Sequence, residues 1–108
     1  MAYSGVVFIE TQVFAKQIVD LLEDEDYRIL QRALVLNPGA GDVIPDSGGL
    51  RKVRWRCSSR GKRGGIRVIY YWLVREHEIY MLLAYAKNRK DDLSIRELRI
   101  LRDWVERM

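Results

Sequence analysis

Basic side chains are concentrated in one stretch of this 108-residue sequence, residues 47–75, which contains nine Lys or Arg and no Asp or Glu. Residues 50–57 and 66–74 have the pattern of two strands joined by a glycine-rich hairpin. In the first strand, the two-residue period places Lys52, Arg54 and Arg56 on one face. A row of cations on a sheet can bind phosphate groups, so we expect a surface that holds RNA and could cut it.

Cleavage of RNA by its own 2′-hydroxyl needs a base, stabilisation of the phosphorane and a proton for the leaving 5′-oxygen. The forked donors of Arg54 and Arg67 suit the non-bridging phosphate oxygens. Lys52 has cationic neighbours, which disfavour its protonated form. Lys52 or Lys87 could therefore act as a base or acid, or both could only bind phosphate. His77, the one histidine, is expected in an exposed turn at the end of the strands opposite the basic hairpin.

Aromatic residues near the basic stretch have two interpretations. Tyr70, Tyr71 and Trp72 could stack on bases, but residues of a central strand more often belong to the core. Trp55 and Tyr85 have the same two alternatives.

The hairpin tip carries Arg60, Lys62 and Arg63, which either bind a polyanion or form a solvated charged loop. Cys57 is the only cysteine, so an internal disulfide and a cysteine-rich zinc site are excluded. A single cysteine is typical of a protein of the reducing cytoplasm.

Hydrophobic periodicity, turn residues and caps predict the elements that must position these side chains. The predicted strands cover residues 6–9, 50–57, 66–74 and 79–86. The predicted helices cover about residues 11–22, the acidic run 23–26 to about residue 36, and the segment that follows Ser94. We interpret residues 40–49 as a connector, and Ser94 with Glu97 as the capping box of the last helix.

The predicted order is β-α-α-β-β-β-α, an α+β domain that takes up residues 1–108. We expect a mostly antiparallel four-stranded sheet with the helices packed on one face. No apolar run reaches the length of a membrane span, and the first residues lack the features of a signal peptide, so we expect a cytoplasmic protein without membrane association.

Three stretches resemble the RelE/ParE superfamily of bacterial toxins, and most closely its HigB branch. They read LNPGAGDVIPDSGGLRKVRW, GKRGGIRVIYYW and LLAYAKNRKDDLS, and together they span residues 36–94. The resemblance implies a RelE-like fold and the toxin of a type II toxin–antitoxin system, a ribosome-dependent mRNA endonuclease. It also implies a helix-turn-helix, HigA-like antitoxin, a hetero-tetramer of toxin and antitoxin, action on mRNA in the ribosomal A site, and no cofactor or metal.

The resemblance also implies a set of site residues. The catalytic set that matches the family's positions is Lys52, Arg54, Arg67, Lys87 and Asn88. The cations expected to bind RNA or the ribosome are Arg51, Arg56, Arg60, Lys62, Arg63, Arg89 and Lys90.

The sequence departs from RelE in having Asn88 where RelE has a second basic residue, and in lacking a tyrosine after Asn88. Two alternatives remain open at this point. ParE relatives share the fold and inhibit DNA gyrase without cutting RNA, and a non-catalytic RNA-binding module would keep the basic surface alone.

Overall fold

A computed structural model describes residues 5–56 and 65–108. The elements are β1 (Val7–Glu10), α1 (Gln12–Leu21), α2 (Asp24–Leu36), β2 (Asp42–Val43), β3 (Arg51–Trp55), β4 (Ile66–Leu73), the 3₁₀ turn η1 (Val74–Glu76), β5 (Glu78–Ala86) and α3 (Ile95–Glu106). This order contains every predicted element. The predictions for Cys57, Arg60, Lys62 and Arg63 lie outside the described residues.

The described strands form one sheet in the order β1-β5-β4-β3-β2. The strands β2 to β5 pair antiparallel, while β1 lies alongside β5 and is parallel to it. A mostly antiparallel sheet was predicted, and this is confirmed.

The sheet has five described strands rather than four, because part of the predicted connector pairs with β3. Asp42 lies opposite Lys52 and Val43 opposite Arg51. The Tyr70 hydroxyl fixes this segment, since it accepts a hydrogen bond from Gly41 N (2.9 Å) and donates one to the Pro38 carbonyl (2.6 Å). A two-residue strand held by a distant side chain has no hydrophobic alternation of its own, so the local pattern did not reveal it.

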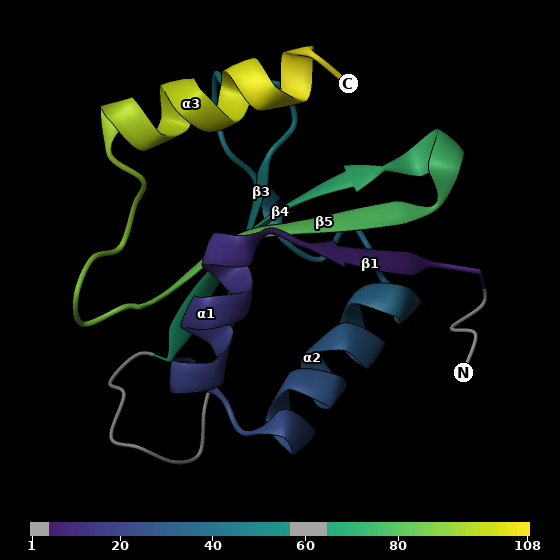
Figure 1. The fold of residues 1–108 in the computed structure, drawn as a ribbon, viewed down its shortest axis with the longest axis vertical. Helices are drawn as coiled ribbons and strands as arrows, with labels where there is room; N and C mark the ends of the chain where they lie inside the picture. Colours follow the sequence, from purple (N-terminus) through teal and green to yellow (C-terminus); the bar gives the residue numbers. More distant parts are fainter. Residues whose placement is uncertain (1–4, 57–64) are drawn as a thin grey trace.

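Helices cover both faces of the sheet, and the prediction that they pack on one face is wrong. Figure 1 shows α1 and α2 on one side of the strands and α3 on the other. Phe14, Ile18 and Leu34 pack on the first face. On the second face Val105 packs in a separate cluster with Ile69. The two central strands, β4 and β5, are apolar on both faces, so each face needs its own cover.

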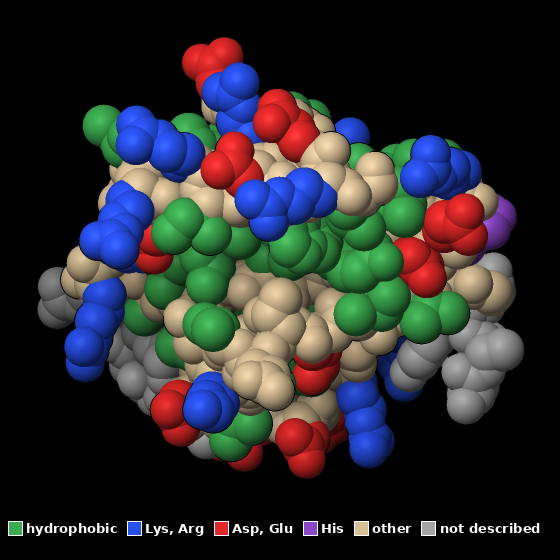
Figure 2. All heavy atoms as spheres, turned by 45° about the horizontal axis from the view of Figure 1, so that its top comes forward, with side chains coloured by type: hydrophobic (Ala, Val, Ile, Leu, Met, Phe, Trp, Pro, Cys, Tyr) green, Lys and Arg blue, Asp and Glu red, His purple; other side chains and the backbone are tan. Residues whose placement is uncertain are grey.

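The second face carries a hydrophobic band bordered by charged side chains, as Figure 2 shows for the side that bears α3. Half-buried residues around the second core cluster belong to this face, and they include Tyr71, Tyr80, Leu98, Leu101 and Trp104. No helix among the described residues has the length and apolar character needed to cross a membrane.

Side chains cap α1 and α3, and the capping box predicted at Ser94 and Glu97 is confirmed. The Thr11 side chain accepts a hydrogen bond from Phe14 N at the start of α1. Ser94 and Glu97 form the complete capping box of α3. The second cap matters for the site, because it fixes the end of the loop that runs from β5 to α3.

A β-bulge in β5 determines which side chains reach the second face. Ile69 pairs with Leu83 but Tyr70 pairs with Met81, so the register shifts at this point. Side chains five positions apart on a regular strand point to opposite faces. Because of the bulge, Tyr80 and Tyr85 both pack with the second cluster.

Three strands end together where the basic hairpin begins. Trp55 pairs with Ile66, and Ile66 pairs with Ala86. Gly65 precedes this point with a left-handed φ of 73°, and its carbonyl accepts a hydrogen bond from Lys87 N at 3.1 Å. A Cβ at Gly65 would lie 2.2 Å from the Trp55 carbonyl oxygen, so only glycine fits.

We predict that Gly65→Ala destabilises the protein by more than about 2 kcal/mol, because it combines a left-handed φ with a backbone clash. Gly5→Ala is the matched control, since Gly5 has φ 82° but a Cβ there would meet no atom within 4 Å. The control should cost only about 1 kcal/mol. Urea denaturation of both variants measures the difference, and equal losses would show that the contact at Gly65 is not limiting.

Candidate functional site

The sheet register brings three of the predicted site cations together on the face that bears α3. Arg54 of β3 lies directly opposite Arg67 of β4, and Lys52 lies opposite Ile69 of the second core cluster. Tyr85 of β5 lies opposite Arg67 on its other side. Adjacent strands therefore contribute neighbouring polar groups to one surface.

These cations differ in burial. Arg67 is only 5% exposed, whereas Arg54 is exposed to solvent. The Lys52 side chain is 14% exposed. Like charges directly opposite on neighbouring strands repel, and a buried cation needs a partner. The arrangement is stable only if anionic groups lie close by.

Two consecutive acids, Asp91 and Asp92, supply that charge from the loop between β5 and α3. Arg67 Nε donates to Asp91 Oδ1 at 3.1 Å. Lys52 Nζ donates to Asp92 Oδ1 at 2.6 Å and to the Asp91 carbonyl oxygen at 3.3 Å. The Tyr85 hydroxyl also donates to the Asp91 carbonyl, at 3.1 Å. Donors from three neighbouring strands thus converge on two residues.

The convergence of these groups shifts the pKa values of Asp92 and Tyr85. The hydrogen bond and charge of Lys52 lower the pKa of the Asp92 carboxyl below its ordinary value, and Arg54 and Arg67 lower it further. Burial raises the pKa of Tyr85 to about 12, and the nearby Asp92 and Asp91 carboxylates add to the rise. The phenol therefore remains protonated at neutral pH and acts as a hydrogen-bond donor.

The turn after β5 places two further predicted residues at the same end of the sheet. Lys87 and Asn88 follow the last residue of β5, and both are exposed. The backbone hydrogen bond from Lys87 N to Gly65 ties this turn to β4. Arg56, one residue beyond β3, and Arg89 are also exposed at this end.

Two of the cations predicted to bind RNA have partners elsewhere. Arg51 lies on the opposite face from Lys52 and donates to the carbonyls of Gly39 (3.2 Å) and Gly41 (2.7 Å). Lys90 pairs with Glu97 and lies 4.9 Å from the centre of the Tyr85 ring. Arg51 therefore lies away from the cluster. Lys90 instead holds the loop between β5 and α3 against Glu97 and Tyr85.

The aromatic residues belong mainly to the two cores. Tyr70 is fully buried, and Tyr71 packs edge-on against Trp104 with ring centres 6.3 Å apart. Trp55 packs against the first core cluster. His77 lies exposed in the turn between β4 and β5, at the end of these strands away from Gly65, as predicted.

Sequence analysis did not assign Asp91 and Asp92 to the site, and it considered Tyr85 only as a stacking or core residue, not as a hydrogen-bond donor to this loop. Asp91 and Asp92 stand beside a basic run in KNRKDD, a signal that a counter-charge was available. Their cationic partners, Arg67 and Lys52, are 24 and 40 positions away in the sequence. No local pattern links residues so far apart.

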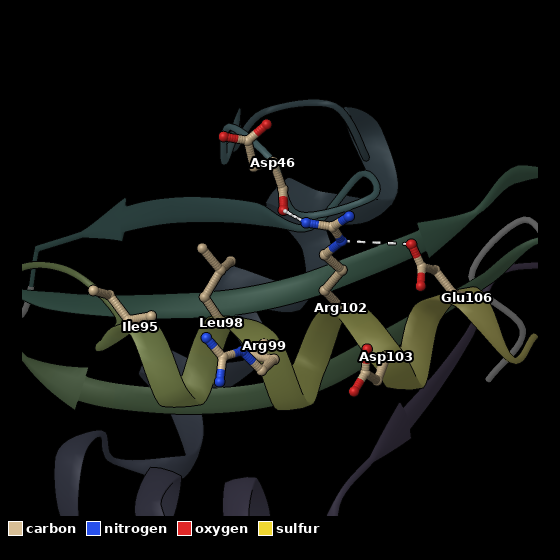
Figure 3. Close-up of a pocket in the computed structure, with 7 residues that line it drawn as sticks. All are labelled: Asp46, Ile95, Leu98, Arg99, Arg102, Asp103 and Glu106. Atoms are coloured by element: carbon tan, nitrogen blue, oxygen red, sulfur yellow. Dashed lines mark hydrogen bonds and ion pairs between the residues drawn. The ribbon is translucent and has the colours of Figure 1, made fainter.

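A groove beside α3 is separate from this cluster (Figure 3). It has a volume of about 250 Å³ and is lined by Asp46, Ile95, Leu98, Arg99, Arg102, Asp103 and Glu106. Arg102 spans it, donating to the Asp46 carbonyl and pairing with Glu106. Within residues 5–56 and 65–108, no group of three His, Cys, Asp or Glu side chains is placed to hold a metal ion.

The arrangement can bind anions without a metal. The Arg67 guanidinium donates to the Asp91 carboxylate, the Lys52 ammonium to the Asp92 carboxylate and the Tyr85 hydroxyl to the Asp91 carbonyl. The same donors suit phosphate oxygens. A second guanidinium, that of Arg54, is exposed beside them.

No family model matches the sequence. Solved structures do share the fold. A doubly substituted E. coli toxin RelE in the free state has a TM-score of 0.58 at 11% identity, over 81% of this chain and 88% of that chain. The intact E. coli RelBE toxin–antitoxin complex gives 0.53 at 15% identity, over 75% and 95%. The same RelE variant bound to a peptide of the antitoxin RelB gives 0.53 at 17% identity, over 82% and 99%. The chain is therefore an α+β protein with a RelE-like fold.

We predict that the low pKa of Asp92 depends on Lys52. The Lys52→Met variant should bring the Asp92 pKa back toward its ordinary value, as measured by NMR titration of the carboxyl carbon. The Lys52–Asp92 pair contributes to stability above the ordinary carboxyl pKa, and the contribution is lost as the pH falls through the lowered pKa of Asp92.

Lys90→Met is the control for this titration. Burial raises the pKa of Glu97, but the hydrogen bonds from Lys90 and Ser94 outweigh it and the pKa is lowered. The control should raise the pKa of Glu97 and leave Asp92 unchanged. If each variant shifted the pKa of both Asp92 and Glu97, the two ion pairs would not be independent, and the prediction would be wrong.

Proposed function

We propose that this chain is the toxin of a type II toxin–antitoxin system and acts as a ribosome-dependent mRNA endonuclease of the RelE/HigB type. The observation that carries the proposal is the juxtaposition of Arg54, Arg67 and Lys52 on one face of the sheet. The fold shared with RelE structures, one free and others bound to antitoxin RelB, supports it. Fold alone does not determine activity, so the cations are the more specific support.

In the proposed reaction, the 2′-hydroxyl oxygen attacks the adjacent phosphorus, and the bond to the 5′-oxygen breaks. The products are a 2′,3′-cyclic phosphate and a free 5′-hydroxyl. Arg54 and Arg67 stabilise the charge on the non-bridging oxygens, and each such donor is worth roughly 10²–10³-fold in rate. This chemistry requires no metal or other cofactor.

Proton transfer is assigned to the lysines. Lys52 or Lys87 takes the 2′-hydroxyl proton or supplies one to the leaving oxygen, and Asn88 donates a hydrogen bond beside them. The ribosome positions the mRNA in line for attack, which lowers the entropic part of the barrier. Arg56 and Arg89 bind the surrounding RNA backbone.

The partners follow from the same proposal. We expect a HigA-like helix-turn-helix antitoxin that forms a hetero-tetramer with the toxin. The substrate is mRNA in the ribosomal A site, and the place of action is the cytoplasm.

Expression of the chain without an antitoxin should arrest growth and fragment mRNAs that are being translated, while untranslated RNA stays intact. Primer extension on a reporter with and without its start codon measures this. Intact transcripts together with relaxed plasmid DNA would instead identify a gyrase inhibitor. Growth arrest with neither change would identify a non-catalytic RNA-binding module.

We predict that Arg54→Ala lowers the mRNA cleavage rate by at least about 10²-fold while the fold is kept, because Arg54 is exposed and is not part of the core. Arg75→Ala is the matched control, since Arg75 is an exposed arginine in η1, away from the cluster. Purified variants are compared on programmed ribosomes, with circular dichroism as the fold check. Equal cleavage by the two variants would remove Arg54 from the site.

A further inference from the structure

The loop between β5 and α3 covers the cations of the proposed site with its own acids. Lys52, Arg67 and Tyr85 all donate to Asp91 or Asp92 at distances of 2.6–3.3 Å. Three adjacent strands thus direct their polar groups at two consecutive residues of one short segment.

The exposed fractions show which groups are on the outside. The Asp91 and Asp92 side chains are 48% and 78% exposed, while their partners Arg67 and Lys52 are 6% and 14% exposed. The carboxylates therefore lie over the cations and face solvent. A ligand approaching Lys52 and Arg67 from solvent meets the carboxylates first.

The ends of the segment are fixed independently of these carboxylates. Lys90 pairs with Glu97 on one side, and Ser94 forms the capping box with Glu97 on the other. Leu93 packs against the second core cluster. The two acids therefore lie between anchors that do not depend on their carboxylates.

A carboxylate and a phosphodiester present the same features to these donors: a negative charge shared over two oxygens. We propose that Asp91 and Asp92 occupy two anion subsites that take consecutive phosphates of single-stranded RNA, and that RNA binds by displacing them. The inference rests on the proposed function for the identity of the ligand. It makes the free chain self-occluded, with its own acids competing against the substrate.

A purely structural role makes the opposite prediction. If Asp91 and Asp92 only hold Arg67 and Lys52 in a binding conformation, then neutralising them disorders the cations and weakens RNA binding. Displacement requires tighter binding after the same change. The sign of the effect therefore decides between the two roles.

The test measures binding of a fluorescent single-stranded RNA, 2′-O-methylated so that it cannot be cleaved, in the absence of ribosomes. Asp91→Asn, Asp92→Asn and the double variant are compared with Asp103→Asn, which removes one charge, as each single variant does. Asp103 is an exposed residue of α3 that has no ion pair within the described chain. Asparagine keeps an acceptor for Arg67, and the exposed Asp92 carboxylate offers a variant that leaves the core untouched.

The double variant should bind RNA about tenfold more tightly than the wild type, and the control less than about twofold. Binding no tighter than that of Asp103→Asn, weaker binding, or no detectable binding by any form at low salt would overturn the inference. Tighter binding without any mRNA cleavage on ribosomes would retain it and remove the proposed function. If the wild type cleaved mRNA but the variants bound RNA no more tightly, the proposed function would be retained and the displacement inference would be wrong.

Discussion

The structure depends on neutralising two arginines that face each other across adjacent strands. Arg54 and Arg67 are a directly opposed pair, and the second is nearly fully buried. Such a pair is unfavourable unless anions lie beside it. Asp91 binds Arg67 directly. Lys52 lowers the pKa of the Asp92 carboxyl, and the charges of Arg54 and Arg67 lower it further. The loop that carries these acids therefore supplies the negative charge that stabilises the cations of the sheet.

The position of that loop connects the second core to the site. The capping box at Ser94 sets where α3 begins, and Leu98, Leu101 and Val105 hold the helix against β4 and β5. The bulge in β5 turns Tyr85 toward the same face. Packing of α3 thus does two things at once, since it buries the second apolar face and delivers the acids to the cations.

Local signals predicted most of the fold, and distant pairings account for what they missed. Caps such as Thr11 and Ser94, and the alternation that separates Lys52 from Val53, depend on near neighbours in the sequence. The strand β2 depends on the Tyr70 hydroxyl, 29 residues beyond Gly41. The apolar character of β4 and β5 indicates that both faces of the sheet must be covered. It does not indicate that α3 is the helix that covers the second face, because this depends on the path of the loop after β5. Strand alternation placed Lys52 and Arg54 on one face, and the family resemblance added Arg67 to the predicted site. The acidic partners come from the loop between β5 and α3, whose path the local pattern does not reveal.

A shared fold at 11–17% identity leaves the chemistry to particular side chains. In this chain the exposed Arg54 and the covered Arg67 and Lys52 belong to the same surface but differ in access. In the proposed mode of binding, an RNA phosphate would reach Arg54 directly, and it would reach the other two only after an acid is displaced. Binding at Arg54 would bring a polyanion beside Asp92, whose exposed carboxylate is repelled by the phosphates as they approach. The same charges that stabilise the free protein therefore set the order in which a nucleic acid would engage the site.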